Sequence, residues 1–218
     1  MASSEISAAT SLRLLRLGDS WTYGVAGTLT PPAGEPLELT GQIMVSIVPD
    51  RLGDRNDWMT ILFSQKFEIT QGDGSKRPMP APEWMFSFVQ DGTTRDLSIA
   101  ADNMTPTGDP RIAKVPQVFY PGSWSAKTAY RNTLDFTNGD SVHNTLAVFG
   151  QEPVETEVGS FVSWVARISS ESAATGVIEG MDWWTPELGA PAKFSTTSTM
   201  PDGSKMRFIA TLKSSSVR

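Results

Sequence analysis

The segment Val177–Trp184 places two carboxylates among tryptophan and methionine side chains. Successive side chains of an extended strand point to opposite faces, so Glu179 and Asp182 lie on different faces and one of them points inward. A buried carboxyl group has a raised pKa and could act as a general acid or as an anchor for a ligand. We expect the inward set to be Glu179, Met181 and Trp183. A register shifted by one residue would place Asp182 inward instead, and the alternative to both is a solvated or ion-paired acid at a strand end.

A second stretch could supply the wall of an apolar site. Trp84, Phe86 and Phe88 alternate with smaller residues and therefore share one face of a strand. Such a stripe is compatible with simple core packing. The seven tryptophans and nine methionines of the chain also fit an apolar ligand cavity. We therefore name Trp84, Phe86, Phe88, Met181 and Trp183 as candidate ligand-binding residues, with Glu179 and Asp182 as candidate catalytic residues.

Most standard catalytic and metal sites are excluded by composition. The chain has one histidine, His143, and no cysteine, whereas zinc sites and nucleophile–histidine pairs are built from these residues. Alternation places His143 on the outer face of its strand, and no Gly-x-Ser-x-Gly or glycine-rich phosphate motif is present. Two acidic loops lack the spacing of a calcium loop: Asp50, Asp54 and Asp57, and Asp102, Asn103 and Asp109. We expect no metal and no cofactor.

Charge and length limit the partners. The 218 residues carry a net charge of −6, which is opposite to the basic surface of a nucleic-acid-binding protein. No apolar run approaches the roughly 20 residues of a transmembrane helix. The first residues contain neither a basic nor an apolar segment of a signal peptide. A chain without cysteine suits the cytoplasm or an export route, and we slightly favour export of a form whose signal peptide is absent here.

Apolar and polar residues alternate with a period of two through most of the segments that must position these residues. Apolar residues alternate with polar ones from Leu37 to Ile47, and Asp-Gly or Asn-Gly turns recur where hairpins need them. These turns are Asp73-Gly74, Asp91-Gly92, Asn138-Gly139 and Asp202-Gly203. We predict an all-β protein with very little helix: one antiparallel barrel or half-barrel of about ten strands over residues 12–218. Residues 1–11 should be flexible, and the proline-rich stretch 104–121 should be irregular and form a lid or a seam.

Two segments resemble a known family. The stretch 152–161 (EPVETEVGSF), followed by 183–193 (WWTPELGAPAK), is similar to a module of bacterial exported β-proteins of the DUF3108-like kind. The opening segment 17–23 (LGDSWTY) is also similar to the beginning of such proteins. The resemblance implies an open or closed β-barrel and frequent export. It assigns no catalytic residue.

Two functions remain compatible with these observations. The first is a non-enzymatic barrel that binds an apolar small molecule or lipid, with an envelope or accessory role. The second is a cofactor-independent β-barrel cyclase or isomerase that shapes an apolar natural-product intermediate in its cavity, since such catalysis needs neither histidine nor cysteine. The sequence favours the binder and leaves the oligomeric state open.

Overall fold

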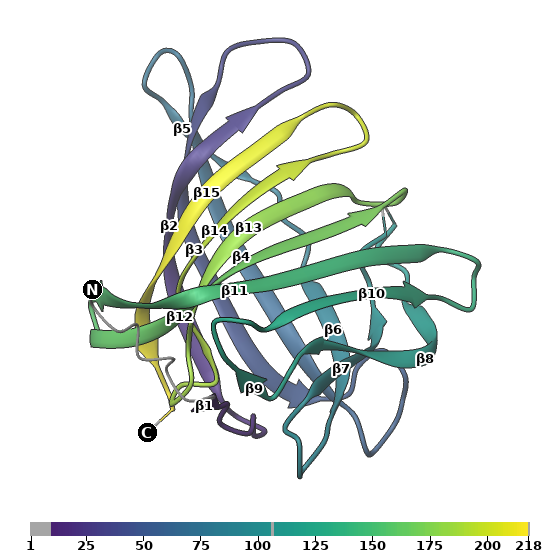
Figure 1. Ribbon diagram of the computed structural model, residues 1–218. Coiled ribbons are helices and arrows are strands. Elements are labelled where there is room, and N and C mark those ends of the chain that lie inside the picture. The colour runs from purple at the N-terminus through teal and green to yellow at the C-terminus, as the bar shows by residue number, and fades with distance from the viewer. Residues whose placement is uncertain (1–9, 106, 218) are drawn as a thin grey trace.

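The computed structural model describes residues 10–105 and 107–217 and is built from strands (Figure 1). The strands are β1 (Thr10–Ser11), β2 (Ser20–Thr30), β3 (Leu37–Pro49), β4 (Met59–Thr70), β5 (Lys76–Met79), β6 (Trp84–Gln90), β7 (Leu97–Asp102), β8 (Arg111–Tyr120), β9 (Ser123–Trp124), β10 (Ala129–Asp135), β11 (Ser141–Thr156), β12 (Gly159–Ser172), β13 (Gly176–Thr185), β14 (Ala190–Thr199) and β15 (Lys205–Ser215). Among these residues no helical segment has the length and apolarity needed to cross a bilayer.

One antiparallel sheet curls into a nearly closed barrel. Its strand order is β10-β11-β12-β13-β14-β15-β2-β3-β4-β6-β7-β8, and β5 adds to the side of β4. Most neighbours are consecutive hairpins, and the pairing of β15 with β2 joins the two halves of the chain. The predicted all-β antiparallel barrel is therefore confirmed, with a few more strands than the ten expected.

The barrel has a seam where its two edge strands meet. Ala113 of β8 forms an isolated bridge with Phe136, the residue directly after β10, and the Thr137 amide donates to the Ile112 carbonyl over 2.9 Å. The amide side chain of Asn132 adds a hydrogen bond to the Val118 carbonyl. This closure is much weaker than the continuous ladders elsewhere in the sheet.

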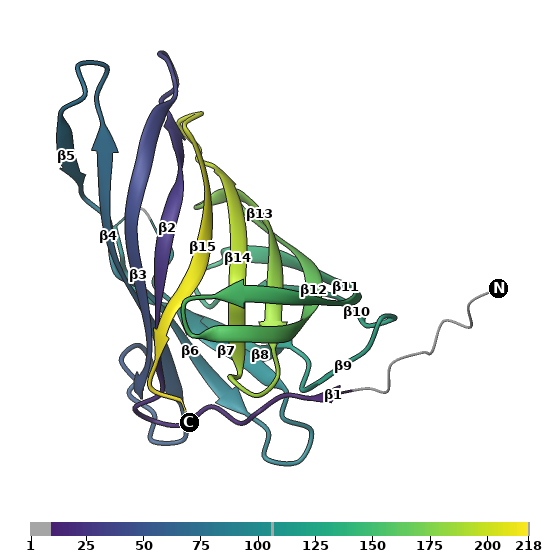
Figure 2. The ribbon, with the colours of Figure 1, turned by 90° about the vertical axis from the view of Figure 1, so that its left-hand side faces the viewer.

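The two ends of the barrel differ. Residues 10–19 run across the lower end in the views of Figures 1 and 2 and bury Leu12 and Leu15 there. The amide of Leu12 donates to the Gly122 carbonyl over 2.9 Å, and the amide of Arg13 donates to the Pro186 carbonyl over 3.0 Å. The N-terminal segment therefore closes the lower end. Hairpin turns, including 31–36, 71–75 and 200–204, surround the upper end.

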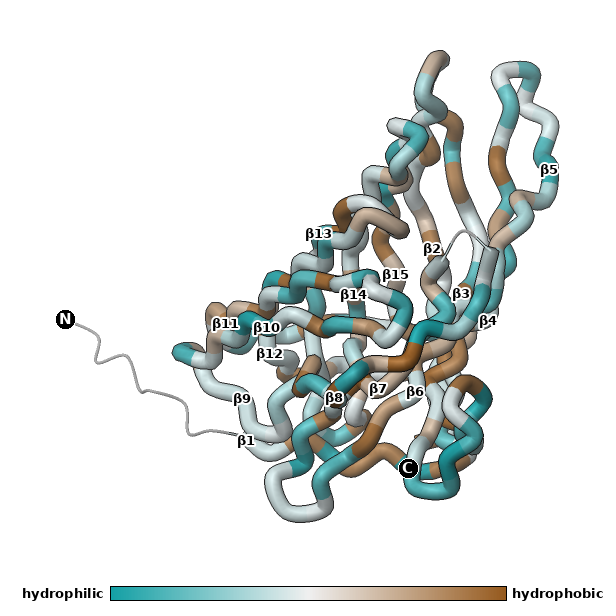
Figure 3. Tube along the Cα trace, turned by 90° about the vertical axis from the view of Figure 1, so that its right-hand side faces the viewer, coloured by the Kyte–Doolittle hydropathy of each residue, from teal (hydrophilic) through white to brown (hydrophobic). Residues whose placement is uncertain are grey.

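Hydropathy alternates along the strands, as Figure 3 shows, and the apolar residues of this alternation form the buried core of the barrel. At mid-height and toward the lower end Trp21, Tyr23 and Leu212 are fully buried. Near the upper end Leu29, Leu37 and Met200 lie against the same core but remain partly exposed. The interior is thus densely packed below and more accessible above.

Two expectations about the connections differ from the structure. The stretch 104–121 was expected to be irregular but contains β8, and residue 106 lies outside the described residues. Pro116 is tolerated because β8 is an edge strand whose pairing with β7 is interrupted by register shifts. Residues 1–9 of the expected flexible segment also lie outside the described residues, whereas Thr10 and Ser11 pair with β9. Movement of 104–121 as a lid stays a prediction.

Candidate functional site

Asp182 is the carboxylate that β13 carries into the barrel. The side chain is almost fully buried, and its cross-strand neighbours on the inner face are Ala166 of β12 and Phe194 of β14. The hydroxyl of Tyr120, on the edge strand β8, donates to Asp182 Oδ2 over 3.1 Å. This hydrogen bond crosses the interior and joins the seam to the opposite wall.

Aromatic rings surround this pair. Tyr120 lies 4.5 Å from the ring of Trp184, measured between centroids, and Trp184 stacks on Trp124 at 5.5 Å. In the described part of the chain, the indole N–H groups of Trp164 and Trp184 are buried without a hydrogen-bond partner. Buried polar groups without partners are rare in folded proteins and often occur at functional sites.

The pKa values at this site follow from the burial of Asp182 without a cation as its partner. Desolvation raises the pKa of Asp182 to about 7, and the Tyr120 hydrogen bond opposes that rise. Burial and the nearby Asp182 carboxylate raise the pKa values of Tyr120 and Tyr23 far above their ordinary range. Both phenols therefore stay neutral, and Asp182 can hold or release a proton near neutral pH. The arrangement offers a single enclosed acid.

The face of β13 expected to point inward points outward. Glu179 is exposed and forms an ion pair with Arg167 over 3.0 Å. Trp183 lies outside too, with the Lys193 ammonium 4.5 Å from its ring centroid. Met181 shares this outer face. Alternation was read correctly, but its phase was wrong, and a one-residue phase error exchanges the two faces. The runner-up, Asp182, is the interior acid.

The aromatic stripe lies on the inner face of β6. Phe88 is fully buried, Trp84 and Phe86 are partly buried against the same core, and Phe86 meets Phe63 edge-to-face at 5.8 Å. Neither of the two cavities described below is lined by these three residues. Their role as a ligand wall stays a prediction.

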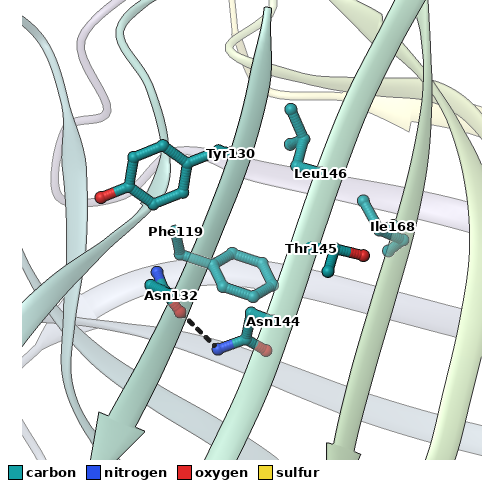
Figure 4. A pocket seen from close by; sticks show the side chains of 7 residues that line it. All are labelled: Phe119, Tyr130, Asn132, Asn144, Thr145, Leu146 and Ile168. Atoms are coloured by element: carbon teal, nitrogen blue, oxygen red, sulfur yellow. Dashed lines mark hydrogen bonds between the residues drawn. The ribbon is translucent and has the colours of Figure 1, made fainter.

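A small cavity lies on the seam side of the barrel, where residues of β8, β10, β11 and β12 line it (Figure 4). Its accessible volume of about 10 Å³ suits one water molecule. The amides of Asn132 and Asn144 point toward one another in it, with Asn144 Nδ2 donating to Asn132 Oδ1 over 3.1 Å. The remaining lining comes from Phe119, Tyr130, Thr145, Leu146 and Ile168.

A larger groove of about 460 Å³ lies at the upper end between the β10–β11 and β12–β13 turns. Its lining includes His143, Glu171 and the buried Arg111. Arg111 binds Asp102 through two hydrogen bonds of 2.8 and 2.9 Å, so the Asp102 carboxylate already compensates its charge. His143 lies on the outer face as expected and bonds Thr133 over 2.9 Å. Within residues 10–105 and 107–217, no cluster of three or more His, Asp or Glu side chains could hold a metal ion.

Sequence reasoning missed Tyr120, Tyr23 and the two asparagines. Tyr120 lies 62 residues before Asp182 in a proline-rich stretch, so no local pattern links them. Alternation does contain a signal for Asn144, because it shares a face with Val142 and Leu146 on the predicted strand. A polar residue on an otherwise apolar face marks an inward polar group.

No known family profile and no curated protein matches this chain. Among solved structures, the fold is similar to a candidate exported protein with a YmcC-like fold from Bacteroides fragilis. That similarity has 11% sequence identity and a TM-score of 0.40, and it covers 94% of this chain and 99% of the other. A candidate lipoprotein from Parabacteroides distasonis is similar at 9% identity and a TM-score of 0.38, with 94% and 98% covered. Neither similarity identifies a ligand or an activity, and the DUF3108-like resemblance stays a prediction.

Proposed function

We propose that this protein binds an apolar small molecule or lipid inside its barrel and that this ligand enters through the upper end. An envelope or accessory role, with export, is part of the same proposal and derives from the sequence resemblance. The aromatic stripe of Trp84, Phe86 and Phe88 would form one wall. Glu179, Met181 and Trp183, which lie outside, have no part in it.

One observation carries the proposal. The barrel is closed below by residues 10–19, while at the upper end apolar inner residues stay partly exposed, among them Leu29, Leu37 and Met200. An apolar ligand binds favourably to apolar surface that faces the interior of a barrel and remains accessible, because binding removes that surface from water. A barrel closed at one end also holds a ligand in a defined direction.

Displacement of an apolar dye tests this proposal. N-phenyl-1-naphthylamine, which fluoresces in apolar surroundings, should bind the wild-type protein, and native mass spectrometry should detect a co-purifying apolar molecule. Leu37→Lys places a charge on the inner face of β3 and should weaken dye binding at least about tenfold. Met44→Lys is the matched control, since Met44 lies exposed on the outer face of the same strand.

The control variant should bind the dye within about twofold of the wild type. Absence of dye binding to the wild-type protein would contradict the proposal. Equal losses in Leu37→Lys and Met44→Lys would place the dye on the outer surface and contradict it as well. Trp84→Ala tests the aromatic wall in the same assay.

A second function, the cyclase or isomerase, is favoured by one observation: Asp182 is an enclosed acid whose pKa is raised to about 7 by burial. A carboxyl group protonated at neutral pH can deliver a proton to an apolar substrate held beside it. Incubation of an acyclic polyprene with the protein in heavy water tests this function. A cyclised or isomerised product that contains deuterium, formed by the wild-type protein but not by Asp182→Asn, would support this function. Polyprene left unchanged by the wild-type protein would contradict it.

A further inference from the structure

A row of directly paired residues crosses the inner face near the upper end and divides into a polar and an apolar half. Each member is the cross-strand partner of the next. In order from β10 to β3 the row is Asn132, Asn144, Ser170, Ile178, Ser198, Met206, Leu29 and Leu37. Cross-strand partners point to the same face, so the whole row faces the interior together with the buried Met206.

The polar half has hydrogen-bonding capacity that the protein does not use. Ser198 is only 5% exposed, and its hydroxyl makes no hydrogen bond to the described residues although its oxygen atom stays accessible. Ser170 is partly buried, and its hydroxyl likewise makes no hydrogen bond within the described ranges. Asn144 donates through Nδ2 to Asn132, which leaves its carbonyl Oδ1 open beside the small cavity of Figure 4. The oxygen atoms of these three side chains are not fully enclosed by the protein, so a ligand inside the barrel can reach them and supply the hydrogen-bond partners that the chain does not.

The apolar half continues directly from the polar one. Met206 belongs to the main core, and Leu29 and Leu37 pack against it while staying partly exposed. No residue of the row is charged. The inner carboxylate of β13, Asp182, lies four residues below Ile178, which is about 13 Å along a strand. The row therefore presents hydrocarbon on one side and uncharged donors and acceptors on the other.

We infer that the ligand is an uncharged amphipathic molecule, with a hydrocarbon part on Met206, Leu29 and Leu37 and hydroxyl, ester or amide groups on Ser198, Ser170 and Asn144. The inference rests on the proposed function and names its ligand class. A purely apolar ligand would bury these polar groups without partners, which is unfavourable. A charged head group would lose its hydration with no counter-ion in the row.

Three matched twelve-carbon probes test the inference: 1-monolauroylglycerol, laurate and dodecane, each delivered from cyclodextrin in competition with N-phenyl-1-naphthylamine. The neutral glycerol ester should bind at least about tenfold more tightly than either of the others. The double variant Ser170→Ala/Ser198→Ala should weaken binding of the glycerol ester about tenfold and leave dodecane binding unchanged. Thr197→Val is the matched control, because Thr197 is paired with the exposed Glu179 and Arg207 on the outer face.

The outcomes separate the inference from the proposed function. Dodecane or laurate binding as tightly as the glycerol ester would overturn the inference and leave the barrel a binder of another class. Equal affinity of the double variant and the wild type for the glycerol ester would overturn it too. Failure of all three probes, and of the dye itself, would overturn the proposed function as well.

Discussion

The barrel buries two aspartates in contrasting ways. Asp102 lies near the upper end beside the seam and is held by Arg111 over 2.8 Å, with the guanidinium 4.3 Å above the ring of Phe136. Asp182 lies deeper, with the neutral Tyr120 hydroxyl as its hydrogen-bond partner. Burial raises the pKa of both aspartates. Only at Asp102 does a neighbouring cation, Arg111, oppose that rise.

The difference indicates two purposes. A bidentate ion pair between adjacent strands fixes geometry, and here it fixes β7 to β8 at the strand that forms the seam. A carboxyl group beside a phenol is free to change its protonation state near neutral pH. We therefore assign Asp102 to structure and Asp182 to the interior site, and the two should respond differently to substitution and to pH.

The largest effect should come from Arg111→Met. The change leaves Asp102 buried without its cation, which costs about 3–5 kcal/mol of unfolding free energy in comparable buried pairs. Urea denaturation at pH 7 measures the loss. The double variant Asp102→Leu/Arg111→Met removes both charges and should recover much of the stability. A loss below about 1 kcal/mol in Arg111→Met would contradict the structural role.

Asp182→Asn should change the pH dependence of stability. The folded-state pKa of Asp182, about 7, exceeds the unfolded value of about 3.9, so its stabilising effect is fully present below pH 4 and is lost as pH rises through 7. Relative to the asparagine variant, the wild-type protein should lose up to about 4 kcal/mol between pH 4 and pH 8. Urea denaturation across this range measures the difference.

The matched control for that experiment is Glu179→Gln on the same strand. Glu179 lies on the outer face in an exposed ion pair, so its removal should change stability by less than about 0.5 kcal/mol at any pH in the range. A pH profile of Asp182→Asn that runs parallel to that of the wild type would show that Asp182 does not titrate near neutrality.

The smallest effect should come from Tyr120→Phe. Its hydroxyl lowers the pKa of Asp182, so its removal should raise that pKa further and cost about 1 kcal/mol when Asp182 is ionised. Carbon-13 NMR of the Asp182 carboxyl group follows the titration. Tyr130→Phe, on the wall of the small cavity, should leave the titration unchanged. An unchanged titration in Tyr120→Phe would contradict the contact across the barrel.

Much of the fold could be predicted because its determinants are local. Alternation and Asn-Gly or Asp-Gly turns locate hairpins without knowledge of their partners, as at Asn138-Gly139 between β10 and β11. The strand β8 was missed because its prolines suggest a loop, whereas an edge strand tolerates them. The closure by residues 10–19 depends on contacts with residues 90, 122 and 186, which no local pattern encodes.

The site could be predicted less well, for a related reason. Alternation places Glu179 and Asp182 on opposite faces but does not say which face is inner. The neighbours settle it: Asp182 pairs with the buried Ala166, whereas Glu179 pairs with the partly exposed Ser169 and Thr197. Pairing between strands sets the phase, and pairing is a long-range property of the chain.

The central claim is that the barrel binds its ligand inside, against the row near the upper end. A crystal structure with a brominated monoacylglycerol tests this most directly, because anomalous scattering locates the bromine atoms. The account predicts a bromine peak inside the barrel beside Met206 and Leu29, with the glycerol group at Ser198. A peak on the outer surface alone, or none at a concentration that saturates dye displacement, would contradict it.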